Sequence, residues 1–341
     1  MYRLLYLLPL LLLACEPEPA EVDTASFDRG KMLTFWADQI IVPAYQDFTA
    51  AARTLDASVN AYATAPEPTA LATVRTDFAT AYLSWQRLSP FMVGPGQQLR
   101  LREQLNVYPT DSSRLFAQSD ADLTLPSNTD IQGFPALDLL LFGTGDPAQH
   151  VEQLQRLTDR ILYLATEAED AWTTTYRATY VANSGNSATA SVDRTVNSFV
   201  QWYERNLRAG KVGIPAGVFG NGPLPDRAEA LYSGDLSRAL FLEGLDAASN
   251  FFDAELGLAT YLDALGVRRD GDLLSTRIRA QFREARTQAA SLDRDFATQV
   301  TTDNGGMLQL YDALQRNVIL LKVDMLQALS INVDFVDADG D

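Results

Sequence analysis

The spacing of apolar residues constrains this chain most, because it follows the period of a helix along nearly the whole length. Patterns that alternate apolar and polar residues, as strands do, are almost absent. The sequence therefore predicts an all-α protein, for which antiparallel helical bundles are the usual architecture. The expected helices cover residues 27–62, 69–91, 133–142, 147–181, 188–207, 235–265, 270–300 and 307–329.

Proline and glycine mark the expected breaks. Pro43 predicts a kink or break in the first helix, and Gly143 stands where a C-terminal cap would close residues 133–142. Residues 94–132 are predicted to be irregular, with several turn motifs. Because that stretch is too long for an ordinary connection, it is a candidate binding or lid region.

The first fifteen residues, MYRLLYLLPLLLLAC, have the organisation of an export signal. Arg3 precedes an apolar run over residues 4–13 that is too short to span a bilayer. The run ends in a sequence similar to the bacterial lipobox, and we expect Cys15, the only cysteine, to carry lipid. The alternative is an ordinary cleaved signal followed by a free thiol. Residues 1–14 are thus expected to be a signal peptide, and residues 15–26 a lipidated cysteine with a flexible tether.

The charge of the chain is strongly negative. It has 27 Lys and Arg against 44 Asp and Glu, a formal net charge of -17. Such a surface repels phosphate backbones and makes nucleic acid a poor candidate partner. It would favour cations, although solubility alone also explains it. The final DFVDADGD resembles the opening of a calcium-binding loop, but without a later Glu it indicates an acidic tail.

Histidine chemistry is scarce. His150 is the only histidine, so neither a two-histidine zinc helix nor a Ser-His-Asp arrangement is convincing. We expect His150 to be a surface residue.

The segment QGFPALDLLLFG places a proline and an aspartate three residues apart at the start of a helix. Pro135 suits a first helical turn, where its missing N–H costs nothing. Asp138 shares its face and lies near the positive end of the helix dipole. By itself this pattern indicates helix-start chemistry more often than a functional site.

A second candidate set lies on one face of the helix expected at residues 235–265. Four oxygen-bearing side chains follow helical spacing there, namely Glu243, Asp246, Asn250 and Asp253. Such a stripe could coordinate a hard cation such as iron(III), calcium or magnesium. A solvated helix face has the same pattern, and the sequence leaves both open.

Several stretches together resemble the imelysin family of bacterial envelope proteins. They are IIVPAYQDF, SWQRLSPFMVGPG, GFPALDLLLFG, GKVGIPAG, LYSGDLS and LSINVDFVDADGD, and they cover residues 27–341. The resemblance implies a fold of two antiparallel helical-bundle halves with a pocket between them. We expect the halves at residues 27–145 and 146–341. Many members of the family are lipoproteins associated with iron uptake.

The family motif G-x-H-x-x-E aligns here with Gly133, Pro135 and Asp138. In the family it was proposed as the metal site of a peptidase. Proline offers no side-chain ligand or base, which weakens a peptidase function, and no catalytic residue can be named. A metal site would need oxygen ligands, Asp138 with Glu243 or Asp246, and would suit iron or calcium.

The resemblance implies a non-catalytic binding protein, anchored in the cell envelope by lipid and associated with iron uptake. Its expected partners are the membrane and iron-uptake components. Its expected place is the outer membrane, facing the periplasm or the cell surface. Two alternatives remain open: a metallopeptidase of the imelysin type with an altered site, and a scaffold that binds another envelope component.

Overall fold

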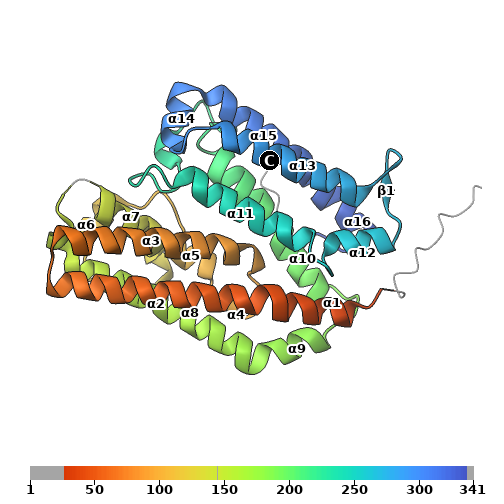
Figure 1. Ribbon diagram of the computed structural model, residues 1–341, viewed down its shortest axis with the longest axis horizontal. Coiled ribbons are helices and arrows are strands. Elements are labelled where there is room, and N and C mark those ends of the chain that lie inside the picture. Colours follow the sequence, from red (N-terminus) through yellow and green to blue (C-terminus); the bar gives the residue numbers. More distant parts are fainter. Residues whose placement is uncertain (1–26, 144, 336–341) are drawn as a thin grey trace, which may run out of the picture.

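The computed structural model describes residues 27–143 and 145–335, whose regular elements are helices and one two-stranded hairpin (Figure 1). The prediction of an all-α fold is confirmed. Cys15 and the aspartates after residue 335 lie outside the described residues. Within these two ranges, no helix combines the length and the apolar character that a membrane span requires.

The N-terminal group of helices, residues 27–182, is built around one long helical rod. This rod comprises α1 (Arg29–Phe35), the π-helix η2 (Trp36–Ile41) and α2 (Val42–Thr64). Helices α3 and α8 pack along opposite sides of α2 (Figure 1). The other helices of the group are α3 (Pro68–Leu88), η3 (Ser89–Phe91), α7 (Gly133–Phe142), η5 (Pro147–His150), α8 (Val151–Ala171), the π-helix η6 (Trp172–Tyr176) and α9 (Arg177–Ala182).

Pro43 does not break the first helix as predicted. It lies in the first turn of α2, directly after the wider π-helical turns of η2. The Val42 N–H accordingly bonds to the Ala37 carbonyl, five residues back. A π-bulge of this kind re-registers the backbone hydrogen bonds, so a residue without an N–H is tolerated while the rod continues.

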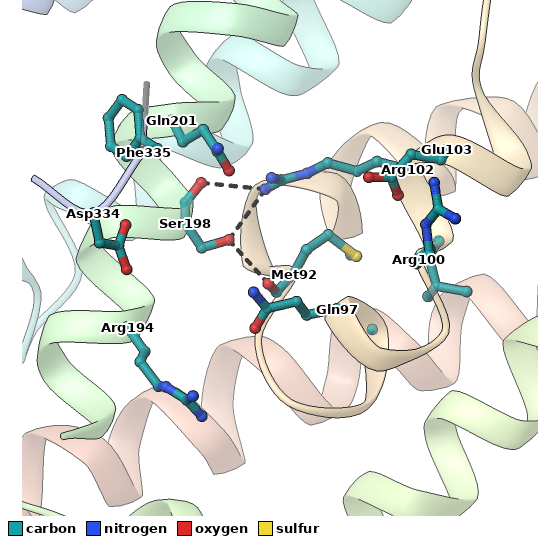
Figure 2. A pocket seen from close by; sticks show the side chains of 12 residues that line it. Met92, Gln97, Arg100, Arg102, Glu103, Arg194, Ser198, Gln201, Asp334 and Phe335 are labelled. Carbon is teal, nitrogen blue, oxygen red and sulfur yellow. Dashed lines mark hydrogen bonds between the residues drawn. The ribbon is translucent and has the colours of Figure 1, made fainter. Parts of the chain in front are cut away.

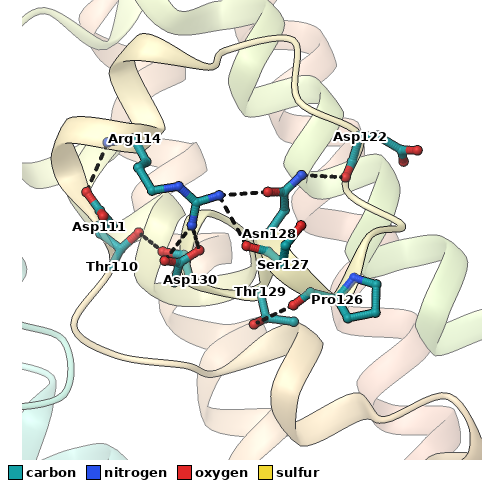
Figure 3. A network of polar contacts seen from close by, with 9 residues as sticks. All are labelled: Thr110, Asp111, Arg114, Asp122, Pro126, Ser127, Asn128, Thr129 and Asp130. Carbon is teal, nitrogen blue, oxygen red and sulfur yellow. Dashed lines mark hydrogen bonds and ion pairs between the residues drawn. The ribbon is translucent and has the colours of Figure 1, made fainter.

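Residues 94–132 are less irregular than predicted, because short helices too brief for a periodicity signal occupy them. They are α4 (Pro95–Gln98), α5 (Leu101–Leu105), α6 (Ser112–Ala117) and η4 (Pro126–Ile131). The Arg114 guanidinium connects α6 to η4 (Figure 3). It pairs with the Asp130 carboxylate and donates a hydrogen bond to Asn128 Oδ1 at 2.8 Å. The Asn128 amide in turn donates to the Asp122 carbonyl at 2.9 Å.

The C-terminal group, residues 191–335, packs against the first through α11 and α3. Two expected helices are interrupted: residues 253–257 separate α11 from α12, and residues 292–295 separate α13 from α14. The elements are α10 (Ser191–Trp202), the π-helix η7 (Tyr203–Gly213), η8 (Pro225–Arg227), α11 (Ser237–Phe252), α12 (Leu258–Ala264), β1 (Arg268–Arg269), β2 (Asp272–Leu273), α13 (Leu274–Ser291), α14 (Phe296–Thr302), α15 (Asn304–Ile319), the π-helix η9 (Leu320–Met325) and α16 (Leu326–Ala328).

The N-terminal group of helices continues past residue 145, where the boundary between the two halves was expected. Helix α8 follows that boundary in sequence, yet its apolar stripe is buried against α2. One continuous apolar core runs through both groups and includes the four tryptophans Trp36, Trp85, Trp172 and Trp202. The two groups therefore share a core rather than forming separate domains.

Candidate functional site

The motif segment begins α7 as predicted, and its glycine is required by geometry. Gly133 has a φ of +73°, a left-handed conformation that side chains disfavour. A Cβ there would lie 2.3 Å from the Leu105 carbonyl oxygen. Pro135 is buried in the first turn. Gly143 follows α7 with extended backbone and not as the left-handed cap that was predicted. A Cβ there would lie 2.5 Å from the Leu139 carbonyl oxygen, so the position has no room for a side chain.

Asp138 lies inside the protein, with only 2% of its surface exposed. Its carboxylate accepts hydrogen bonds from the backbone N–H groups of Tyr232, at 2.9 Å, and Ser233, at 3.0 Å. Burial raises the pKa of Asp138, and the two N–H donors oppose that shift. The side chain therefore binds the segment before α11 onto α7, a role that differs from helix-start chemistry.

A buried ionic cluster lies beside Asp138, where the two groups of helices meet. Glu229 is its centre: its Oε2 pairs with the Lys211 ammonium of η7. Its Oε1 accepts hydrogen bonds from three side chains of the N-terminal group, the Tyr82 hydroxyl at 3.1 Å, the Gln86 amide at 3.2 Å and the Asn106 amide at 2.7 Å. The groups that contact the Glu229 carboxylate are thus side chains of the protein itself.

Burial dominates the electrostatics of the cluster. It lowers the pKa of Lys211, an effect that the neighbouring Glu229 carboxylate opposes. Burial and the same carboxylate hold the pKa of Tyr82 well above its usual range. The adjoining cavity, lined in part by Asn106 and Lys211, measures about 20 Å³, which is room for one water molecule. A substrate cannot enter this space.

The structure does not gather Asp138, Glu243 and Asp246 into one site. Glu243 pairs with Arg87 of α3 at 2.7 Å, and Asp246 pairs with Arg286 of α13. Over residues 27–143 and 145–335, no group of three or more His, Cys, Asp or Glu side chains could hold a metal ion. The acidic face of α11 is instead largely balanced by arginines.

His150 lies half-buried in η5, with its ring 5.3 Å from that of Phe116. It therefore contacts a neighbouring aromatic ring rather than standing free on the surface. No ion pair involving His150 occurs in the described part of the chain.

Several hollows open where the groups of helices meet, and two of them bear on the candidate site. One is a groove of about 450 Å³ between η2, α2 and α11, with Ile40, Pro43 and Phe251 in its wall and Glu243 and Asp246 also lining it. The other is a polar pocket of about 330 Å³. Figure 2 shows the polar pocket lying between the α4–α5 region and α10, with arginine side chains on both sides.

Sequence reasoning missed Glu229 and Lys211, although part of their signal was present. Lys211 lies in the stretch GKVGIPAG, Tyr232 and Ser233 lie in LYSGDLS, and Gln86 lies in SWQRLSP. These stretches meet GFPALDLLLFG around the ionic cluster. Glu229 lies outside all of them, and only the three-dimensional arrangement identifies it.

Comparisons with known proteins agree on the fold. A family model described as Peptidase_M75: Imelysin matches residues 41–321. An imelysin-like protein from Psychrobacter arcticum 273-4 superposes with a TM-score of 0.74 at 18% identity, over 93% of this chain and 99% of that one. A protein from Parabacteroides distasonis ATCC 8503, named as an iron-regulated protein A precursor, has a TM-score of 0.72 at 14% identity, over 91% and 96%. No functionally curated protein matches the chain.

Proposed function

Because the chain belongs to the imelysin family, we propose that it is a non-catalytic binding protein of the bacterial cell envelope, associated with iron uptake. A structural neighbour bears the name of an iron-regulated protein precursor, which supports the association with iron and with export. The binding site of this proposal is the junction between the two groups of helices, where both hollows open.

The proposal that the protein is non-catalytic rests on the two residues at the motif position, Pro135 and Asp138. Pro135 has no group that could bind a metal or move a proton. Asp138 is occupied by two backbone N–H groups inside the protein. A peptidase needs an accessible nucleophile, base or metal-bound water, and this position supplies none of them.

The proposal has two direct tests. The purified protein should not cleave an unfolded substrate such as reduced casein, with or without added zinc or iron. A strain without the gene should grow more slowly under iron limitation and recover when the gene is returned. Metal-dependent cleavage by the wild type, lost on chelation, would instead support the metallopeptidase alternative.

The envelope location is proposed to depend on lipid at Cys15. Cys15→Ala should move the protein from the membrane fraction to the soluble fraction and abolish labelling by a radioactive fatty acid. A variant that stays lipid-labelled and in the membrane fraction would exclude this anchor.

A scaffold function is the second candidate, and one surface feature favours it. The connection between η7 and α11 exposes several large apolar side chains, namely Ile214, Phe219, Leu224 and Tyr232. Apolar side chains gathered on one segment are typical of a surface that contacts another protein.

A further inference from the structure

We propose that the polar pocket between the α4–α5 region and α10 binds a small hydroxycarboxylate with several carboxylate groups. In the proposed role, iron would then be bound as an anionic chelate of such a ligand rather than as a bare ion. This inference names the ligand class for the proposed function and rests on it.

Arg102 is a half-buried cation whose hydrogen-bond partners in the described residues are all neutral. Its Nε donates to the Ser89 carbonyl at 3.0 Å. Its Nη2 donates to the carbonyls of Pro90, at 3.3 Å, and Ser198, at 3.2 Å, and to the Ser198 hydroxyl at 3.2 Å (Figure 2). Its Nη1 makes no hydrogen bond to the residues that the structure describes. The guanidinium is thus oriented by the fold, and it forms no direct ion pair with a carboxylate of the described residues, although the nearby Glu103 carboxylate stabilises its charge.

Without a direct ion pair, the positive charge of Arg102 is only partly compensated. Burial lowers the pKa of Arg102 to about 10, because the charged form has lost much of its hydration, and the Glu103 carboxylate opposes this shift. A buried charge is normally paired. An anion in the pocket would supply that pair, and a carboxylate matches the planar guanidinium in geometry.

The remaining walls provide further donors for an oxyanion. Arg194 and Gln201 lie seven residues apart on one face of α10 and both line the pocket. The hydroxyl of Ser198, which lies between them, already donates to the Met92 carbonyl at 3.1 Å. Gln97 and Arg100 line the opposite side (Figure 2). Arginine and amide groups together suit a ligand with more than one carboxylate.

Two carboxylates also line the pocket and restrict the ligand. Glu103 and Asp334 face the same space as the three arginines, so the lining carries three positive and two negative charges. This local excess is positive in a chain whose net charge is -17. Ionised carboxylates only accept hydrogen bonds, so they favour a ligand that also has hydroxyl donors. The volume of about 330 Å³ fits a small organic ligand.

The described residues lack a metal-ligand cluster, which favours an iron chelate over bare iron(III) as the bound species. Bare iron(III) needs several oxygen ligands from the protein, and the described residues hold no group of three acids or histidines that could supply them. A chelate brings its own ligands to the metal. The protein then needs only to recognise the negative exterior of the chelate, for which arginines are suited.

The test is calorimetric titration of the full chain with citrate, ferric citrate and inorganic phosphate. Citrate and ferric citrate should both bind, and Arg194→Gln should weaken both by about tenfold or more, as loss of one charge-assisted hydrogen bond predicts. Arg194 is exposed, so its replacement should not disturb folding. Arg102→Lys retains the charge but not the planar geometry and should also weaken binding.

Arg53→Gln is the matched control, since Arg53 is exposed on α2 and outside the pocket. It makes the same charge change and should leave binding unaltered. The inference is overturned if neither citrate form binds, if phosphate binds as tightly as citrate, or if Arg53→Gln weakens binding as much as Arg194→Gln. Growth of the complemented strain under iron limitation tests the proposed function separately, and normal rescue by Arg194→Gln would overturn the inference alone.

Discussion

Glu229 connects the two groups of helices at their junction through buried polar contacts. Its carboxylate, 3% exposed, holds the Lys211 ammonium and three side-chain donors from the N-terminal group. A buried pair is not a strong source of net stability, because both ions lose hydration. Loss of one partner is nevertheless costly, because the other charge stays buried without compensation.

Glu229→Gln should therefore lower the free energy of unfolding by about 3–5 kcal/mol, measured by urea denaturation. Adding Lys211→Met should recover part of that loss, because the unpaired ammonium is removed. The half-exposed pair Arg87–Glu243 offers a comparison at the same junction. Glu243→Gln should cost no more than about 1 kcal/mol. Equal effects of the two Glu→Gln changes would contradict the importance of burial.

Because the pKa of Asp138 is raised, its contribution to the free energy of unfolding depends on pH, and the direction of the shift sets the sign of that dependence. Between the ordinary value of 3.8 and the raised value, the folded protein keeps a proton that the unfolded chain has lost. The contribution of Asp138 to the free energy of unfolding is therefore greatest below the ordinary value and falls as the pH rises through the raised pKa. The difference in unfolding free energy between wild type and Asp138→Asn should narrow from pH 4 to pH 7. A difference that widens would show that the pKa is lowered instead.

At the scale of the element, the start of α7 depends on Gly133. A side chain there would adopt an unfavourable φ and meet the backbone of α5. Gly133→Ala should lower the free energy of unfolding by at least about 1–2 kcal/mol, the cost of the left-handed conformation alone. Gly185→Ala is the control, since a Cβ at Gly185 would meet nothing within 4 Å. Similar stability of both variants would mean that α7 shifts to accept the methyl group.

At the scale of the whole molecule, the shared core predicts cooperative unfolding. The buried apolar residues form one cluster across both groups, and α3 packs directly on α11. Neither group can lose its partner without exposing apolar surface, which is unfavourable in water. Calorimetry should show one transition whose calorimetric and van't Hoff enthalpies agree. Two separate transitions would mean that the groups are independent domains.

The sequence by itself determined the helical class, most helix positions and the family. Helical periodicity is a local property, since the apolar face of a helix is set by residues three and four apart. Helices α3 and α7 accordingly begin and end close to their expected residues. The helix expected at residues 147–181 corresponds to the consecutive helices η5, α8, η6 and α9. The family resemblance is also local, because each short stretch can be recognised without its neighbours in space.

Only the tertiary structure decided which residues form the candidate sites. Glu229 and Lys211 are 18 residues apart and lie on irregular and π-helical segments, so no spacing rule links them. Arg102 and Ser198, 96 residues apart, meet because α10 crosses the chain that follows α3. A local pattern shows that a side chain is charged. Only packing removes the water around that side chain and fixes its partners. Loss of water and fixed partners together set the pKa and the binding properties of the buried ions and of the arginine pocket.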